Sequence, residues 1–169
     1  MSDCQCPPSI PDFHLKDVDL SAAAVHRLPV AAFFFMPLSY HSYAEKQRQA
    51  IIDLELTERW PGLILSHTGL LRGSIMRVLQ TANSPSRFVS TLPADFVLQG
   101  YIHKGGMGTI KSAVRALQNH LFDQGRMPKE LYLSYLTCPR CEASKGGEQI
   151  LLLRRFIESS TLKNRLKKK

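Results

Sequence analysis

The stretch that decides the fold covers residues 95–136 and reads DFVLQGYIHKGGMGTIKSAVRALQNHLFDQGRMPKELYLSYL. Its first nine residues favour a strand, and Gly105-Gly106 favours a turn. Residues 107–124 carry apolar side chains at helical spacing, which predicts a helix that Gly125 ends. Residues 130–136 then alternate in polarity as a second strand does. The apolar stripe of the predicted helix comprises Ile110, Ala113, Val114, Leu117 and Leu121.

The same layout extends in both directions from this stretch. After a turn-rich loop, residues 148–157 predict a last, strongly apolar strand. The first half shows a strand at 30–36, a helix at 42–60 with Ser42 as its N-cap, and strands at 62–68 and 74–81. We therefore expect an α+β fold of two β-α-β-β repeats, which form one antiparallel sheet with two helices on one face. The other face is left open, and an open, aromatic sheet face is a natural ligand site.

The length of 169 residues fits a single domain, because domains usually run to about 100–200 residues. We expect residues 1–27 to be an irregular lead-in, residues 28–158 the ligand-binding domain, and residues 159–169 a basic tail. The net charge is +8, and the tail supplies five positive charges with no acid among them. Such a tail is usually solvated and disordered, and it can attract nucleic acid in a salt-sensitive way. The five residues are Lys163, Arg165, Lys167, Lys168 and Lys169.

No part of the sequence predicts insertion into a membrane or export. A helix needs about 18–20 apolar residues to span a bilayer, and the longest candidate, Leu28–Leu38, is shorter. Residues 1–11 lack a basic region followed by an apolar run, so no signal peptide is predicted. We therefore expect a soluble, cytoplasmic protein whose cysteines are thiols or metal ligands rather than disulfides.

Short motifs in the second half carry a family resemblance. They are Leu92-Pro93-Ala94, Tyr101-Ile102-His103-Lys104-Gly105, a helix with Ile110, Ala113 and Leu117, then Gly125, Pro128 and Glu130-Leu131-Tyr132. With these motifs, residues 92–157 resemble the gyrase-inhibitor-like (GyrI-like) effector-binding superfamily. The first half matches in element order, but its first strand ends in Met36-Pro37 where the family often has a His-x-Gly-like turn. The long loop with Cys138 and Cys141 is a second departure, and both departures bear on the ligand more than on the fold.

The resemblance implies a pocket between two pseudo-symmetric halves that takes up lipophilic, often cationic, aromatic compounds. Some relatives stand alone, some are fused to DNA-binding helices, and a few hydrolyse strained electrophiles. The segments at both ends of this chain are too short for a helix-turn-helix extension. The resemblance therefore predicts a stand-alone small-molecule-binding protein.

Glu130 is the first candidate for contact with a ligand. Alternation along its strand places Glu130 and Tyr132 on one face and the leucines on the other. A carboxylate among aromatic rings can neutralise a cationic ligand, and the rings add cation–π attraction of about 0.5–2 kcal/mol. The alternatives are a solvated charge for Glu130 and core positions for the aromatic residues. The further candidates are Tyr101 and His103 on one strand face, Phe33 and Phe35 on another, and Trp60.

The four cysteines form two tight pairs. One residue separates Cys4 from Cys6, and Cys138-Pro139-Arg140-Cys141 has the spacing typical of a zinc knuckle. Together, Cys4, Cys6, Cys138 and Cys141 supply four thiolates for a tetrahedral structural zinc site, which would tie the lead-in to the last loop. A redox pair at Cys138 and Cys141 and plain unpaired thiols are the alternatives.

Two other functions stay open beside ligand binding. A hydrolase of a reactive small molecule would use Glu130 to activate water, oriented by a Tyr or Trp, although no Gly-x-Ser-x-Gly motif occurs. A zinc-stabilised nucleic-acid-binding or protein-interaction module would use the basic tail and scattered cations. Nucleic-acid binding would fall steeply with salt, whereas ligand binding would be lost on Glu130→Gln. The sequence favours a binding protein and assigns no catalytic residue.

Overall fold

A computed structural model describes residues 4–168 of the chain. These residues form nine β-strands and three α-helices, which confirms the predicted α+β class. The chain divides into two compact units. The terminal unit combines Met1–Leu20 with Phe96–Lys169, and the central unit is Ser21–Asp95. Each unit repeats the predicted order of a strand, a helix and two strands, with short strands added.

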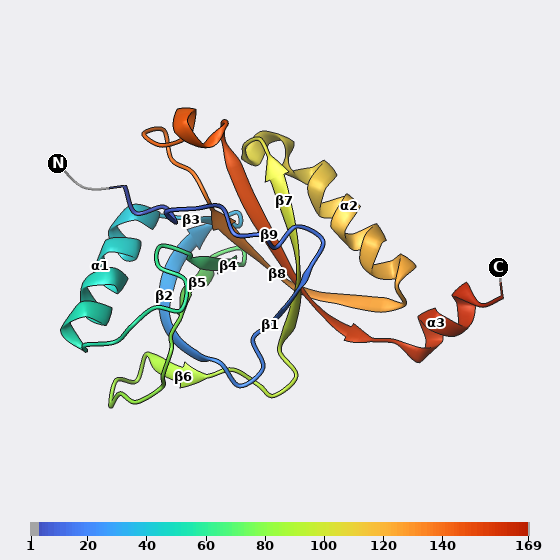
Figure 1. The fold of residues 1–169 in the computed structure, drawn as a ribbon, viewed down its shortest axis with the longest axis horizontal. Helices are drawn as coiled ribbons and strands as arrows, with labels where there is room; N and C mark the ends of the chain where they lie inside the picture. Colours follow the sequence, from blue (N-terminus) through green and yellow to red (C-terminus); the bar gives the residue numbers. More distant parts are fainter. Residues whose placement is uncertain (1–3, 169) are drawn as a thin grey trace. The chain divides into compact units, whose positions relative to one another are not determined.

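The terminal unit is an antiparallel sheet with a helix along one face (Figure 1). Its strand order is β1-β7-β9-β8. Strand β9 is central, and it pairs Leu152 with Tyr101 on one side and with Leu133 on the other. The bounds are β1 Asp17–Asp19, β7 Val97–Lys104, β8 Arg126–Tyr135, β9 Gln149–Glu158, the 3-10 turn η1 Met107–Thr109 and helix α2 Ile110–Asp123.

The predicted apolar stripe builds the core of the terminal unit. Helix α2 packs four buried side chains onto three of β9, and Val114 lies partly buried beside them. Full burial of such aliphatic side chains contributes about 1.5–3 kcal/mol each before entropy is counted. Alternate residues of β8, Leu131 and Leu133, pack against the same cluster. The buried members are Ile110, Ala113, Leu117 and Leu121 from α2, and Ile150, Leu152 and Phe156 from β9.

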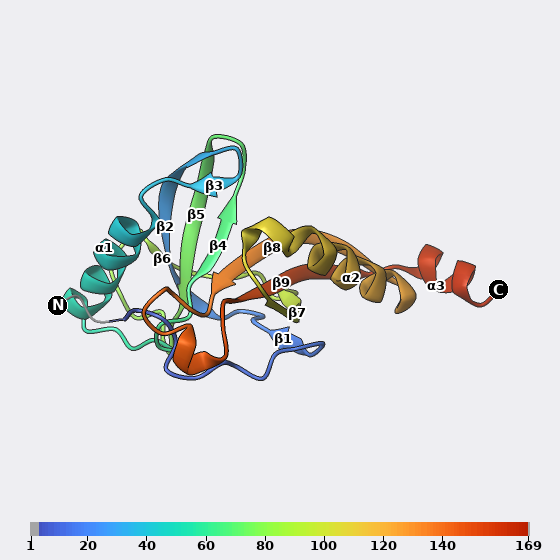
Figure 2. The ribbon, with the colours of Figure 1, turned by 90° about the horizontal axis from the view of Figure 1, so that it is seen from above.

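The central unit has the strand order β4-β5-β2-β3, and a further strand, β6, pairs with β2. Helix α1 packs Ala44 against Leu28, Val30 and Ile75 of the sheet. Figure 2 shows how the β2–β3 and β4–β5 hairpins extend side by side, where Phe34 N donates to Leu70 O at 2.9 Å. The bounds are β2 Ala24–Phe33, β3 Met36–Pro37, α1 Tyr40–Asp53, β4 Leu65–Thr68, β5 Arg72–Val78 and β6 Val89–Thr91.

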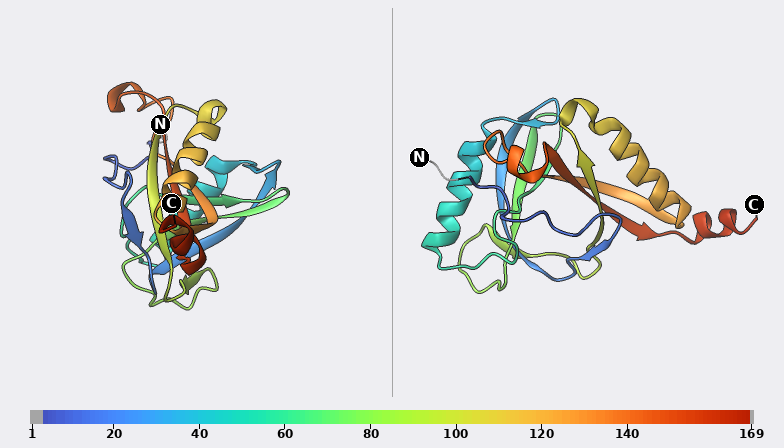
Figure 3. Two further views of the ribbon diagram at one scale, coloured as in Figure 1. Left: turned by 90° about the vertical axis from the view of Figure 1, so that its right-hand side faces the viewer. Right: turned by 45° about the horizontal axis from the view of Figure 1, so that its top comes forward.

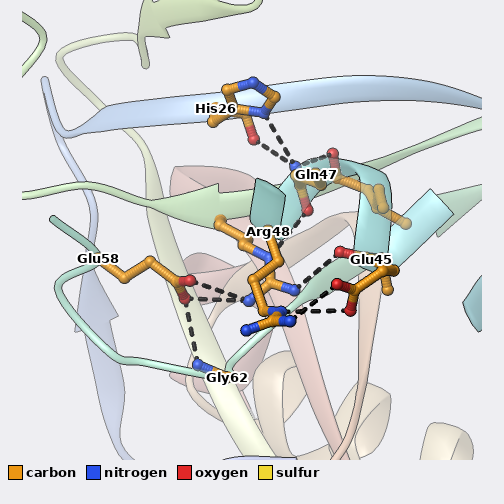
Figure 4. A network of polar contacts seen from close by, with 9 residues as sticks. His26, Glu45, Gln47, Arg48, Glu58 and Gly62 are labelled. Atoms are coloured by element: carbon orange, nitrogen blue, oxygen red, sulfur yellow. Dashed lines mark hydrogen bonds and ion pairs between the residues drawn. The ribbon is translucent and has the colours of Figure 1, made fainter. Parts of the chain in front are cut away.

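A buried polar network lies under α1 (Figure 4). Arg77 is 1% exposed, and its guanidinium donates to both carboxylate oxygens of Glu58, at 3.0 and 3.2 Å. Arg77 Nε donates to Gln47 Oε1 at 3.1 Å, and Nη2 donates to the carbonyl oxygen of Ala44 at 3.2 Å. Gln47 Nε2 in turn donates to the carbonyl oxygen of His26 at 2.9 Å. The charge of the buried cation is therefore matched, and the network fastens α1 to the sheet.

The first strand and helix differ from the predicted bounds. Strand β2 begins earlier than residue 30 and ends at Phe33, because Phe34 and Phe35 adopt φ of 46° and 66° and form the turn to β3. Phe33 and Phe35 therefore do not share a strand face. Helix α1 starts at Tyr40 and ends at Asp53, so Ser42 is not the N-cap and the Pro-Gly pair at 61–62 is not what stops the helix.

The lead-in and the tail both contain regular structure. Strand β1 lies in the lead-in, and β2 begins at Ala24, before the predicted domain boundary at residue 28. In the tail, α3 (Ser160–Leu166) begins where Ser159 Oγ accepts a hydrogen bond from Leu162 N at 3.4 Å. A second 3-10 turn, η2 (Ala143–Lys145), lies in the loop before β9. Across residues 4–168, no helix has both the length and the apolar character needed to span a bilayer.

Candidate functional site

The face of the terminal sheet opposite α2 carries an acid, a cation and two rings. Leu131 and Leu133 point towards α2, so the intervening Tyr132 lies on the opposite face. There the Tyr132 ring is 5.9 Å from the ring of Phe96, at an interplanar angle of 65°. The Glu130 carboxylate lies 3.5 Å from Nη1 of Arg155, whose guanidinium carbon is 5.1 Å from the Phe96 ring centre. We call Phe96, Glu130, Tyr132 and Arg155 the acidic aromatic cluster.

The acidic aromatic cluster differs from an open aromatic cup. Tyr132 and Phe96 are buried, at 7% and 4% exposure, so the rings form the floor. The Glu130 side chain is 42% exposed and that of Arg155 is 20% exposed, so solvent reaches the cluster through the ion pair. A cationic ligand at Glu130 would have to replace the guanidinium of Arg155. Neither Phe96 nor Arg155 was predicted, because their proximity to Glu130 depends on strand register.

Tyr101 and His103 lie on the other face of the same sheet. Tyr101 is opposite Leu152 in the register and packs against the α2 core, so the structure does not bring it to Glu130. Its ring is 4.8 Å from the imidazole of His14, whose Nδ1 accepts a hydrogen bond from Ile102 N at 3.0 Å. No motif in the sequence singles out His14.

His103 makes a hydroxyl–imidazole pair with Thr109. Its buried Nε2 lies 2.9 Å from Thr109 Oγ1, and the Thr109 side chain is exposed. Gly105, with φ of 139°, makes room for the pair, because a Cβ there would lie 2.9 Å from the hydroxyl. The carboxylate of Glu148 lies against the adjacent Gly106. A hydroxyl beside an imidazole base can act as a nucleophile, and it can equally stabilise the turn into η1.

Phe33, Phe35 and Trp60 all belong to the central unit. Phe33 and Phe35 are exposed, and the Phe33 ring meets the ring of Phe34 edge-on at 4.6 Å. The guanidinium of Arg59 lies 4.6 Å from the centre of the Trp60 ring. A hollow of 540 Å³ opens in this unit between residues 22–24 and 79–82. Arg59 lines that hollow, and none of the predicted ligand residues does.

The structure brings the four cysteines together in the terminal unit. Their sulfur atoms all lie within 4.8 Å of one another. Cys4 Sγ is 3.6 Å from Cys138 Sγ, which is 3.8 Å from Cys141 Sγ. We call this group the thiol cluster. None of its members forms a disulfide, and the approach of two pairs from opposite ends of the chain was predicted from their spacing.

The thiol pKa values of Cys6 and Cys138 are shifted in opposite directions. Burial raises the pKa of the Cys6 thiol well above its usual range. Burial also acts to raise the pKa of Cys138, but hydrogen bonds from the backbone N–H groups of Arg140 and Cys141 outweigh it and lower that pKa to about 7. Cys138 therefore ionises before Cys6. A thiolate is the form that binds metal ions.

Comparison with solved structures shows that the fold is similar to that of known protein domains. The crystal structure of the EcmrR C-terminal domain matches with a TM-score of 0.59 and 14% identity, over 85% of this chain and 95% of that one. The cryo-EM structure of an EcmrR–DNA complex matches with a TM-score of 0.56 and 13% identity, over 85% of this chain and 56% of that one. At this identity the likeness concerns the fold alone.

Sequence comparison places the chain in a family. No curated protein matches it. A family model described as "Bacterial hydrolase" matches residues 2–156, which covers both units and the thiol cluster. The chain therefore belongs to this bacterial hydrolase family.

Proposed function

We propose that the chain binds a lipophilic or cationic small molecule at the acidic aromatic cluster. The observation that carries the proposal is the position of Glu130, a half-exposed carboxylate paired with Arg155, whose guanidinium lies against the buried ring of Phe96 next to Tyr132. The GyrI-like resemblance, with its Glu-x-Tyr motif at Glu130, supports the same site. The proposed setting is the cytoplasm, where the four cysteines would remain thiols.

The Glu130–Arg155 ion pair provides a mechanism of selection. An incoming cation takes the place of the Arg155 guanidinium beside the Glu130 carboxylate, and its aromatic part lies against the rings of the floor. The incoming cation supplies the positive charge that the Arg155 guanidinium withdraws into solvent, so the Glu130 carboxylate stays paired throughout. A neutral ligand that displaced the Arg155 guanidinium would leave the Glu130 carboxylate unpaired, so the cluster favours cationic aromatic compounds.

A thermal-shift screen with lipophilic cationic dyes and neutral isosteres tests the proposal. Binding to the native state raises the melting temperature. Glu130→Gln should abolish the shift by cationic dyes, and Arg155→Gln should increase it because the competing guanidinium is gone. Asp123→Asn, at the exposed end of α2, is the matched control and should behave as wild type. A wild type that no dye stabilises, or a Glu130→Gln variant that binds as well as wild type, would contradict the proposal.

A hydrolytic function is the second candidate, because the matching family model is described as a hydrolase. Glu130 is proposed to activate water, as an ionised carboxylate can. The His103–Thr109 pair is the competing source of a nucleophile, at 2.9 Å. A panel of activated esters and strained electrophiles separates the two: Glu130→Gln abolishes turnover in the first case, and Thr109→Val does so in the second. Turnover that survives both substitutions excludes both assignments.

A metal ion belongs to the proposal as a cofactor. We propose that zinc binds at the thiol cluster, because four sulfur donors within 4.8 Å of one another suit zinc. A zinc-stabilised module that binds nucleic acid or a protein is the remaining alternative. One of the two similar structures is a complex of EcmrR with DNA, and the basic tail of this chain offers the charge for such contact. Binding that falls steeply with salt would favour this alternative.

A further inference from the structure

We infer that the thiol cluster is a structural zinc site. The ion would act as a clasp, because it joins the N-terminal lead-in to the β8–β9 loop and so keeps the lead-in alongside strand β7. The clasp rests on the proposed binding of zinc and is independent of the proposed small-molecule ligand. Two pairs of cysteines, at the start of the lead-in and in the β8–β9 loop, meet across 134 residues of sequence. Figure 3 shows the lead-in passing beside the η2 turn of that loop.

The sulfur positions fit a tetrahedral ion. Zinc–sulfur bonds of about 2.3 Å at tetrahedral angles place sulfur atoms about 3.8 Å apart. The distances from Cys138 Sγ to the sulfurs of Cys4 and Cys141 are 3.6 and 3.8 Å. The largest separation in the cluster, 4.8 Å, needs a movement of about an ångström. Side-chain rotation alone can supply that movement.

The β8–β9 loop is folded so that it presents its two sulfurs. Cys141 N and Glu142 N both donate to the carbonyl oxygen of Cys138, at 2.9 and 3.0 Å, which closes a tight turn. Cys138 N donates to Cys141 Sγ at 3.3 Å, so a backbone N–H group already faces the sulfur. An N–H group directed at a sulfur stabilises the thiolate form that a metal ion requires. The turn therefore favours a metal ligand over a buried apolar thiol.

The donor set excludes a hydrolytic role for this ion. Catalytic zinc sites keep an open position for water, whereas structural sites are closed by four protein ligands. The thiol cluster supplies four thiols from Cys4, Cys6, Cys138 and Cys141, which fill the tetrahedron. The ion would therefore hold two segments together and leave any hydrolysis to the other side chains.

The clasp acts together with other contacts that hold the lead-in. Lys145 donates from Nζ to the carbonyl oxygen of Pro7, a second link between the loop and the lead-in. Further along, Leu15 N donates to Gly100 O at 2.8 Å, and Gly100 N donates to Lys16 O at 3.0 Å. Gly100 permits this approach, because a Cβ there would lie 2.1 Å from the carbonyl oxygen of Phe13. The lead-in thereby becomes an edge of the sheet, and zinc holds residues 4–6 in place.

Metal analysis of the purified chain, expressed with zinc in the medium, tests the clasp. We expect one zinc ion per chain, and cobalt substitution should give the intense visible absorption of a tetrahedral thiolate site. The double variants Cys4→Ser with Cys6→Ser, and Cys138→Ser with Cys141→Ser, should each lose the ion. Ser144→Ala, in the same loop, is the control and should retain it. A zinc-free protein that takes up neither metal on titration, or disulfides among these cysteines, would overturn the inference.

Hydrogen exchange on the wild type keeps the test independent of whether the variants fold. Removing zinc with a chelator should raise the exchange rates of the Leu15 and Gly100 amides at least tenfold. The amides of β8 and β9 that pair within the sheet should change little. Equal rates with and without zinc would show that the ion is not a clasp. Dye binding is read separately, so a protein that binds dyes but no zinc overturns the proposed zinc binding and the clasp, and leaves the proposed small-molecule site standing.

Discussion

At the scale of single residues, the buried Arg77 is the most consequential side chain of the central unit. It is bound to Glu58, Gln47 and the carbonyl oxygen of Ala44. Removing one partner of a buried pair leaves an uncompensated charge and costs about 3–5 kcal/mol. The network therefore sets the local stability of α1 more strongly than any exposed ion pair on its surface.

The first prediction concerns this ion pair. We expect Arg77→Met to lower the free energy of unfolding by about 3–5 kcal/mol, measured by urea denaturation. Arg48→Met removes the partner of the half-exposed Glu45 within α1 and should cost far less, because solvent screens that pair. Equal losses in the two variants would show that removal of Arg77 leaves no uncompensated buried charge on Glu58.

The second prediction concerns pH. Burial, followed by the charge of Arg77, lowers the pKa of His26 below its usual 6.5. Below pH 6.5 the unfolded chain protonates His26 more readily than the folded chain does. The contribution of neutral His26 to the free energy of unfolding is therefore fully present above pH 6.5 and is lost as the pH falls below it. Melting temperatures measured at several pH values on either side of 6.5 should show this slope of stability against pH. His26→Gln should remove the part of the slope that His26 causes, and an unchanged slope would refute it.

At the scale of elements, helix α2 shows what local sequence can predict. Its stripe of apolar residues repeats with the helical period, and the four buried members all face β9. Helix α1 shows the limit, because charged and apolar residues continue to residue 60 while the helix ends at Asp53. There Glu55 adopts φ of 55°, and Glu58 forms a bridge with Leu79. A contact with β5's end thus decides where the helix stops.

The third prediction compares two leucines on two helices. Leu117 of α2 is 1% exposed, whereas Leu166 of α3 is 41% exposed. Leu117→Ala should lower the free energy of unfolding by about 2–5 kcal/mol, and Leu166→Ala should change it by about 0.5 kcal/mol or less. Chemical denaturation followed by circular dichroism measures both. A larger loss at Leu166 would mean that α3 is packed in solution.

At the scale of the whole molecule, charge is concentrated in the tail. The chain has a net charge of +8, and five of its 22 Lys and Arg residues lie between residues 163 and 169. Lys163 also pairs with Glu158, so part of that charge is already engaged. The tail is where weak, salt-dependent contact with nucleic acid would arise, separately from the acidic aromatic cluster.

The fourth prediction follows from this distribution. If the chain binds DNA through the tail, log affinity against log salt should have a negative slope, and each phosphate contact contributes about 0.9 to it. Replacing the five tail cations with glutamine should flatten the slope by up to about 4.5. Replacing the exposed Lys46 and Lys111 instead should leave it unchanged. Binding that survives the tail replacement would place the contact elsewhere.

The sequence by itself determined the α+β class, the repeated order of strand, helix and two strands, and the two cysteine pairs as candidate ligands. These features depend on residues that are close together in the chain: the periods of helix and strand fix which side chains share a face, and the short spacing of each cysteine pair keeps its two thiols close. Only the tertiary structure decided that Tyr101 and Tyr132 face opposite ways, that Arg155 is bound to Glu130, and that the lead-in forms an edge strand. Such contacts join residues far apart in the chain, and strand register, which no local pattern contains, selects them.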